Sequence, residues 1–189
     1  MGSRRCVMIE TRIATSGDEA AIRRMLKRAA RLPIQNWYWE DHLGQENFQL
    51  ALAGGRPVGA LLAWADVLPI AWVRLAVLMP AVTVGEWLDR SLLPILVALR
   101  RRRARWLGWM DAGGWAESAL MSRGFHSQTR LVTLVKSDRL LPPLSAPEIE
   151  VRPVRPDDMT DVVRIDRAAF TPPWWLSGET LSRRRAESI

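Results

Sequence analysis

The chain has 189 residues, of which 48% are hydrophobic, and a formal net charge of +7. A chain of this length can bury one core of about 140 residues but not two of that size, so we expect a single complete domain. Its one cysteine, Cys6, excludes an intrachain disulfide and fits a reducing, cytoplasmic compartment.

The first predicted elements are a strand over residues 8–14 and a helix that ends near Arg31. Ser16 is followed three residues later by Glu19, which is the spacing of a capping box at a helix start. One face of this helix should be buried, because apolar residues recur on it at helical spacing. They are Ile22, Met25, Leu26 and Ala29. A polar and aromatic connector follows over residues 35–42.

Three strands are predicted next, over residues 48–53, 57–66 and 71–79. The pair Gly54-Gly55 separates the first two and can supply the positive φ angles of a tight hairpin. These three strands would form the centre of a sheet.

Residues 85–101 have the apolar period of a helix. Its buried stripe consists of Leu88, Leu92, Ile95, Leu96 and Leu99. Pro94 lies inside this helix and removes the hydrogen bond to the carbonyl four residues earlier, so we expect a kink or a break there. A strand over residues 105–110 and a helix over residues 115–123 follow, and Gly124 is placed to close that helix in the left-handed conformation.

A last strand over residues 130–136 completes the predicted domain. The fold class is therefore α/β in the wider sense (α+β), with a mixed central sheet flanked by helices. The element order is strand, helix, connector, three strands, helix, strand, helix and strand.

The opening of the chain recurs near its end with the same spacing. The first copy is Ile9-Glu10-Thr11-Arg12 with Asp18, Ile22 and Arg24, and the second is Ile149-Glu150-Val151-Arg152 with Asp158, Val162 and Arg164. Such a recurrence is typical of a duplicated structural unit. We therefore expect a domain at residues 8–137, a proline-rich linker at 138–147, and the first strand and helix of a truncated second domain at 148–189.

Much of the excess positive charge lies in two arginine runs, residues 100–103 and 183–185. The first falls at the end of a predicted helix, where cations complement the helix dipole, so we interpret it as a solvated helix end rather than a nucleic-acid site. No zinc-ligand spacing is present, and no metal site is predicted. The apolar stretch 57–85 is not expected to cross a membrane, because Asp66 and Arg74 would each cost about 2.5 to 3.5 kcal/mol near the bilayer centre.

The element order and four local features resemble the GCN5-related N-acetyltransferase (GNAT) superfamily over residues 8–137. The features are Arg12 with Asp18, Pro57-Val58-Gly59 after the hairpin, Leu75-Ala76-Val77 before the long helix, and Arg123-Gly124-Phe125 before the last strand. The repeat makes the chain similar to a tandem member of that superfamily.

This resemblance implies that the strand at residues 71–79 pairs its backbone with the pantetheine arm of acetyl-CoA. The cofactor-binding residues would be Leu75, Ala76, Val77, Val84 and Gly85. The last two belong to the loop that cradles the pyrophosphate in the family.

The match to the family's pyrophosphate loop is poor. Val84 stands where a cation belongs, and Trp87 and Asp89 stand where small residues belong. Glu86 adds a negative charge, and one unit charge about 4 Å from a phosphate repels it by roughly 4 kcal/mol at an effective dielectric of about 20. We therefore expect this domain to bind CoA weakly or not at all.

Many members of the superfamily use a carboxylate to deprotonate the acceptor amine and a tyrosine on the last helix to protonate the thiolate. The one tyrosine of this chain, Tyr38, lies in the connector instead. The resemblance makes Asp66 and Asp111 candidate bases and places Ser118 near the usual position of the acid. The alternative is that both aspartates are solvated residues at strand ends.

The connector lines the acceptor side in this superfamily, which makes Trp37, Tyr38 and Trp39 candidates for binding an amine or a ligand ring. The alternative is that these aromatic side chains fill a core or a seam between domains. His42 and His126 are interpreted as polar surface residues.

Taken together, the resemblance implies a full-length tandem N-acetyltransferase that moves acetyl from acetyl-CoA to a small-molecule or peptide amine. In that protein, this first domain would be degenerate. The alternative is a noncatalytic binding or dimerisation module of the same fold. A homodimer, or pairing with a complete second domain in the same chain, is the expected association, and neither a membrane nor a nucleic acid is an expected partner.

Overall fold

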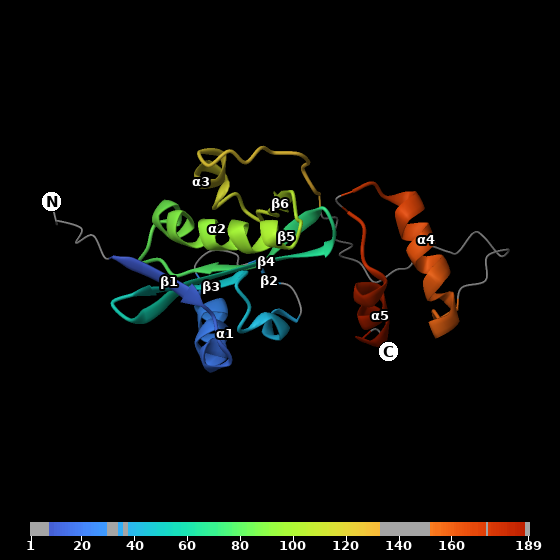
Figure 1. Ribbon diagram of the computed structural model, residues 1–189, viewed down its shortest axis with the longest axis horizontal. Coiled ribbons are helices and arrows are strands. Elements are labelled where there is room, and N and C mark those ends of the chain that lie inside the picture. The colour runs from blue at the N-terminus through green and yellow to red at the C-terminus, as the bar shows by residue number, and fades with distance from the viewer. Residues whose placement is uncertain (1–7, 30–33, 36–37, 133–151, 173, 188–189) are drawn as a thin grey trace, which may run out of the picture.

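In the computed structural model, a six-stranded mixed sheet lies between helices on its two faces (Figure 1). The structure describes residues 8–29, 34–35, 38–132, 152–172 and 174–187. In sheet order the main path is β1 (Ile9–Ile13), β3 (Phe48–Ala53), β4 (Arg56–Val67), β5 (Ile70–Leu78) and β2 (Ile34–Gln35), and β6 (Trp106–Gly108) also pairs with β5. Among the pairs of described strands, only β5 and β6 run parallel. The predicted fold class is confirmed.

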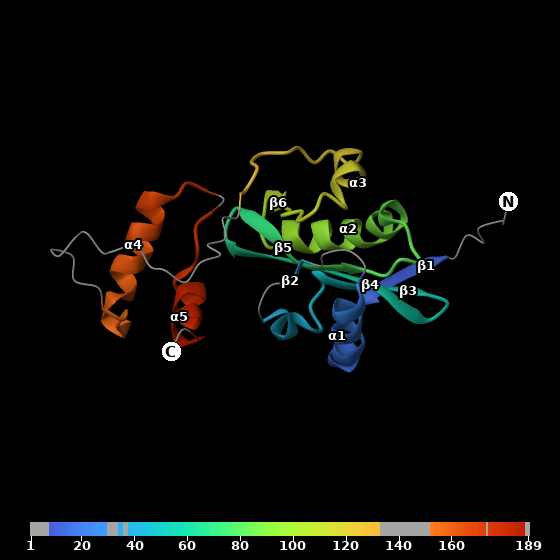
Figure 2. The same cartoon turned by 180° about the vertical axis from the view of Figure 1, so that it is seen from behind.

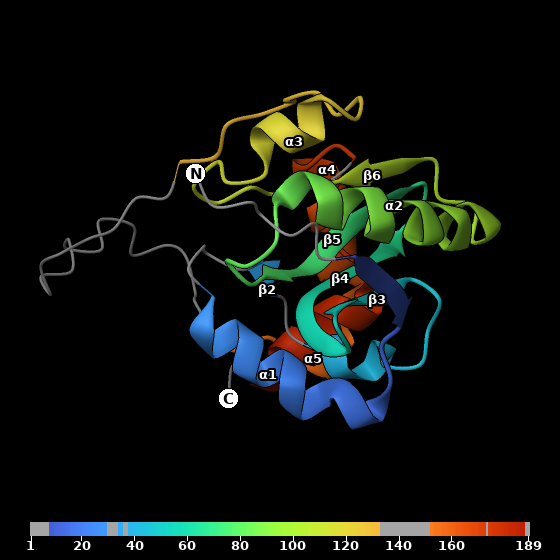
Figure 3. The ribbon, with the colours of Figure 1, turned by 90° about the vertical axis from the view of Figure 1, so that its left-hand side faces the viewer.

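The helices divide into two layers (Figure 3). One face of the sheet is covered by α1 (Glu19–Arg28) and the 3-10 turn η2 (Trp39–His42), and the other by α2 (Val84–Arg101) and α3 (Glu117–Met121). Each layer has its own apolar cluster, because side chains alternate between the two faces along every strand.

The first helix begins differently from the prediction. Ser16–Asp18 form the 3-10 turn η1, and the capping carboxylate is that of Asp18, not Glu19. The Asp18 carboxylate accepts hydrogen bonds from the backbone N–H of Thr15 at 2.8 Å and from its Oγ1 at 2.9 Å. It also accepts two hydrogen bonds from the Arg12 guanidinium, both at 2.7 Å. A carboxylate at this point satisfies an N–H that has no partner within the helix.

The predicted hairpin between β3 and β4 is confirmed. Gly54 and Gly55 occupy its turn with φ angles of 56° and 74°. On the first helix, Ile22 and Met25 of the predicted apolar face are buried. Of the stripe predicted on α2, Leu96 is exposed at 43%, so it is not part of the core.

Pro94 lies within α2 without breaking it. A proline cannot donate to the carbonyl four residues earlier, which here belongs to Arg90. The hydroxyl of Thr11 on β1 donates a hydrogen bond to that carbonyl at 3.2 Å. A side chain from the sheet therefore takes the place of the missing backbone donor.

The helix α3 at the end of the first unit is shorter than predicted, and the described part of the last predicted strand is not a strand. The helix α3 covers five residues, and it is followed by Gly124 with a φ of 82° and by Phe125, which packs against the core as predicted. Residues 130–132 do not form a strand, and residues 133–136 of the predicted last strand lie outside the described residues.

The local structure of the second sequence copy matches that of the first. A 3-10 turn, η3 (Pro156–Asp158), leads into α4 (Met159–Ala169), as η1 leads into α1. The Arg152 guanidinium donates to the Asp158 carboxylate at 2.6 and 2.9 Å, and the N–H of Arg155 donates to the same carboxylate at 2.7 Å. The linker 138–147 and most of the strand predicted for this copy lie outside the described residues.

A further helix, α5 (Gly178–Glu187), was not predicted. It packs with α4 beyond the tip of the β4–β5 hairpin (Figure 2). Among the described residues, no helix combines the length and the apolar character needed to cross a bilayer.

Candidate functional site

The centre of β5 contains one extra residue. Leu62 of β4 pairs with Leu75, but the next residue, Ala63, pairs with Val73, so Arg74 has no opposite residue. This is the geometry of a β-bulge, which re-aims the side chains that follow it. As a result, Val73 packs in the cluster under α2, whereas Leu75 packs in the cluster next to α1.

The outer edge of β5 is divided at this bulge. β6 pairs with Ile70–Trp72 and goes no further, and β2 pairs antiparallel with Leu75 and Ala76. The backbone at these two positions is the part of the strand expected to hold the pantetheine arm of CoA. In this structure, the chain's own residues 34–35 are paired there.

The first turn of α2 is capped from within. Glu86 accepts a hydrogen bond at 2.6 Å from the hydroxyl of Thr83, the N-cap residue, and its own N–H donates to that hydroxyl at 3.3 Å. A carboxylate in the first turn complements the positive end of the helix dipole. The negative charge that a phosphate would bring to Val84 and Gly85 is therefore already supplied by a side chain.

A cation also lies beside this turn, contributed by the turn that follows α3. The Arg123 guanidinium donates to the carbonyl oxygen of Gly85 at 2.9 Å and to the Asp89 carboxylate at 2.7 Å. Asp89 therefore neutralises this arginine.

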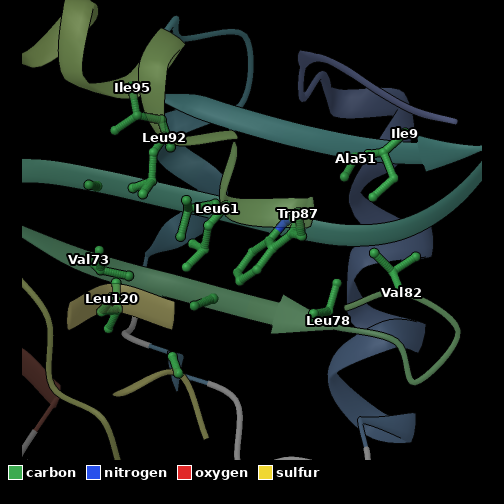
Figure 4. Close-up of a cluster of buried hydrophobic side chains, with 14 of the residues drawn as sticks. Ile9, Ala51, Leu61, Val73, Leu78, Val82, Trp87, Leu92, Ile95 and Leu120 are labelled. Carbon is green, nitrogen blue, oxygen red and sulfur yellow. The ribbon is translucent and has the colours of Figure 1, made fainter. Parts of the chain in front are cut away.

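Trp87 does not obstruct the loop, contrary to the prediction. Its side chain is fully buried and points into the core between α2 and the sheet (Figure 4). It packs in a notch at Gly59, where an added Cβ would lie 2.8 Å from the indole nitrogen. The ring centroids of Trp109 and Trp115 lie 6.4 and 6.1 Å from that of Trp87. Only the acidic side chains at this loop remain as obstacles to a phosphate.

The connector contributes one aromatic side chain to the core and another that lies partly at the surface. Trp39 is 1% exposed and packs edge-on against Phe48 at 6.0 Å, so it fills the core. Tyr38 has a left-handed backbone conformation with a φ of 67°, which is strained for an aromatic residue. The Arg183 guanidinium of α5 lies 5.1 Å from the centre of its ring. Trp37 lies outside the described residues.

Two basic side chains near the connector, those of His42 and Arg74, are partly buried. His42 stacks on the ring of Trp64 at 4.1 Å, and burial lowers the pKa of its imidazole, so its interpretation as a plain surface residue is wrong. The Arg74 guanidinium lies 5.3 Å from the centre of the same Trp64 ring, and burial lowers its pKa as well. His126 is exposed, as predicted.

The three candidate catalytic residues do not converge. Asp66 accepts three hydrogen bonds from Ser177 and Thr180 in the C-terminal segment. Asp111 accepts a hydrogen bond at 2.9 Å from the N–H of Ala116, so it holds the turn before α3. Ser118 is exposed on α3, on the opposite layer from the connector. Neither aspartate is a simple solvated strand-end residue.

Comparison with known proteins finds similarity at the level of structure. No protein-family model and no curated protein sequence matches the chain. The N-acetylglutamate synthase of Neisseria gonorrhoeae, complexed with coenzyme A and N-acetyl-glutamate, superposes with a TM-score of 0.51 at 18% identity. The match covers 66% of this chain and 30% of that chain, so this protein corresponds to less than a third of the synthase.

Two further structures match over most of their length. The aminoglycoside N-acetyltransferase AAC(6')-Iy, in complex with a CoA bisubstrate analogue, has a TM-score of 0.53 at 12% identity and covers 68% of this chain and 98% of its own. The Mycobacterium tuberculosis protein Rv2747, in complex with CoA and NLQ, has a TM-score of 0.51 at 18% identity. The match covers 82% of this chain and 81% of that chain. The chain has the GNAT fold.

The GNAT fold implies acetyl-CoA, and the residues present fit this cofactor poorly. The pantetheine edge at Leu75 and Ala76 is paired with β2, and Glu86 caps the helix start where the pyrophosphate would bind. The nearest cation described here, Arg123, is paired with Asp89. We therefore derive no chemical step through CoA at this site.

Sequence reasoning missed two of the groups that define this site. The motif Arg123-Gly124-Phe125 is visible in the sequence, but nothing in its spacing indicates that the arginine reaches the start of α2. The bulge at Arg74 had one visible signal: a charged residue interrupts an otherwise apolar strand.

Proposed function

We propose that this chain belongs to a tandem N-acetyltransferase of GNAT fold that transfers acetyl from acetyl-CoA to an amine. In this proposal, the first unit, residues 8–137, is degenerate and binds CoA weakly or not at all. The observation that carries it is the pairing of β2 with Leu75 and Ala76. A bound pantetheine would have to compete with hydrogen bonds that the chain makes to itself.

The repeat supports the tandem part of the proposal. The ion pair of Arg12 with Asp18 and that of Arg152 with Asp158 have the same sequence spacing and the same bidentate geometry. Each carboxylate also accepts a hydrogen bond from the backbone N–H three residues before it. Two segments that agree in both pattern and contacts are best explained as copies of one structural unit.

Titration with acetyl-CoA tests the proposal directly. We expect no change in melting temperature or tryptophan fluorescence at up to about 100 µM acetyl-CoA, a concentration at which a micromolar site would add about 2.7 kcal/mol of stability. The matched variant is Glu86→Gln, which removes the charge at the helix start and leaves β2 in place. We expect this variant not to bind either.

A clear shift with the unmodified chain would refute the proposal that the first unit is degenerate. Binding by Glu86→Gln alone would mean that the carboxylate, and not the paired strand, is the obstacle. That result would contradict the argument from β2.

The alternative function is a noncatalytic binding or dimerisation module, and one surface favours it. Leu93, Leu96 and Val97 follow helical spacing on the outer side of α2 and are exposed at 67%, 43% and 43%. A contiguous apolar stripe of this kind is typical of an interaction surface. Sedimentation velocity distinguishes the two functions: a dimer that is lost in Leu93→Glu would support the alternative.

A further inference from the structure

Asp66 acts as a cap for a helix in a distant part of the chain. Its carboxylate accepts hydrogen bonds from the N–H of Ser177 at 2.9 Å, from the Ser177 hydroxyl at 2.6 Å and from the Thr180 hydroxyl at 2.8 Å. The Ser177 hydroxyl in turn accepts from the N–H of Thr180 at 3.0 Å. The carboxylate therefore lies at the positive end of α5, where a negative charge is stabilised by the helix dipole.

Two other contacts fix the same segment. The Arg183 guanidinium donates to the Asp41 carboxylate at 2.8 Å and lies over the ring of Tyr38. The ring of Trp174 lies 5.4 Å from that of Trp72 on β5. The contacts with Tyr38 and Asp41 lie within the connector, which is the acceptor side implied by the GNAT fold.

The charges of the two surfaces are complementary. Asp41 and Asp66 face a segment that carries Arg183 and the dipole of α5. The carboxylate of Asp66 accepts three hydrogen bonds from this segment, two on Oδ1 and one on Oδ2.

We infer that residues 174–183 form an intramolecular cover that closes the acceptor side of the first unit, with Asp66 as its anchoring residue. This inference rests on the proposed function only in identifying the covered surface as the acceptor side. The covered surface presents two carboxylates, those of Asp41 and Asp66, and the ring of Tyr38. The cover presents hydroxyl side chains at the start of α5 and an arginine about one and a half helical turns later.

Replacing Asp66 with asparagine tests the cover in the full chain. An amide oxygen accepts fewer hydrogen bonds than a carboxylate, and the amide NH₂ would face donors. We expect the backbone amides of Ser177 and Thr180 to exchange with deuterium about tenfold faster than in the unmodified protein, because losing the cap lowers the free energy of local opening at the start of α5. Asp161→Asn is the matched control, because Asp161 pairs with Arg164 within α4 and makes the same change of charge.

Tyr38 provides a second readout that is independent of exchange. It is the only tyrosine of the chain, so nitration by tetranitromethane can be assigned to one ring. We expect its nitration rate to rise several-fold in Asp66→Asn and also in Ser177→Ala. The second variant changes only the cover, which guards against a folding defect in the first unit.

Equal exchange and nitration in Asp66→Asn, Ser177→Ala and the control would overturn the inference. A decrease in the protection of Tyr38 from nitration on dilution would also overturn it, because the cover would then come from a second copy of the chain. Neither readout involves acetyl-CoA, so failure of the cover and failure of the proposed function can be told apart.

Discussion

Replacing Trp87 with alanine should lower the free energy of unfolding by about 3 to 5 kcal/mol, the range measured for large aromatic residues removed from cores. Trp87 is fully buried and contacts both the sheet, at the notch of Gly59, and the rings of Trp109 and Trp115. Domains of this kind have a total stability of about 5 to 15 kcal/mol, so the variant should be close to unfolding. Urea denaturation followed by circular dichroism measures the change.

Trp106→Ala is the matched control for this variant. Trp106 is 67% exposed at the start of β6, so the same chemical change should alter stability by no more than about 0.5 kcal/mol. If Trp87→Ala proved as stable as Trp106→Ala, then Trp87 would not be in the core, and the loop before α2 would be sterically blocked as the sequence suggested.

Replacing Asp18 with asparagine should cost about 1.5 to 3 kcal/mol, the usual range for hydrogen bonds to a charged group. The Asp18 side chain is 11% exposed and accepts two hydrogen bonds from Arg12 and two from Thr15. Asparagine has one acceptor oxygen and cannot replace all four. The measurement is again urea denaturation, at pH 7.

The effect of Asp18→Asn should depend on pH in a defined direction. The hydrogen bonds from Arg12, followed by those from Thr15, hold the pKa of the Asp18 carboxyl well below its ordinary value, although burial acts in the opposite direction. A lowered pKa means that the stabilisation is fully present above the unfolded pKa of about 3.9 and is lost as the pH falls towards the folded pKa. The difference between the wild-type protein and the variant should therefore shrink as the pH falls below about 4.

The chain contains its own control for this prediction. Asp158 makes the same bidentate pair with Arg152 in the second copy, but there the helix that follows has no buried residues. Asp158→Asn should therefore destabilise the protein less than Asp18→Asn. Equal effects at the two positions would mean that the contribution of Asp18 is purely local and does not depend on the core under α1.

Local pattern was sufficient for the elements whose signals lie close together in the sequence. The glycine pair predicted the hairpin of β3 and β4, and helical spacing predicted α1 and α2 to within a few residues. The repeat was also visible in the sequence alone. Its two copies share the Arg–Asp spacing because the same 3-10 turn precedes a helix in both. The ion pair that holds this turn joins residues only six positions apart.

Contacts between distant segments were not predictable in this way. The pairing of β2 with β5 involves only residues 34–35, which is too short to produce a periodic signal. The interpretation of Trp87 failed because a residue in the first turn of a helix can face either the loop or the core. Its direction is decided by the absence of a Cβ at Gly59, on a different strand.

The sequence by itself determined the order of elements, the duplicated opening and the acidic start of α2, because each of these depends on neighbours within a few positions. Only the tertiary structure decided that Asp66 caps α5, that β2 lies on the edge of β5, and that Thr11 satisfies the carbonyl freed by Pro94. Each of these contacts joins segments separated by tens of residues. Their hydrogen bonds form only after the chain has folded back on itself, so no local pattern can report them.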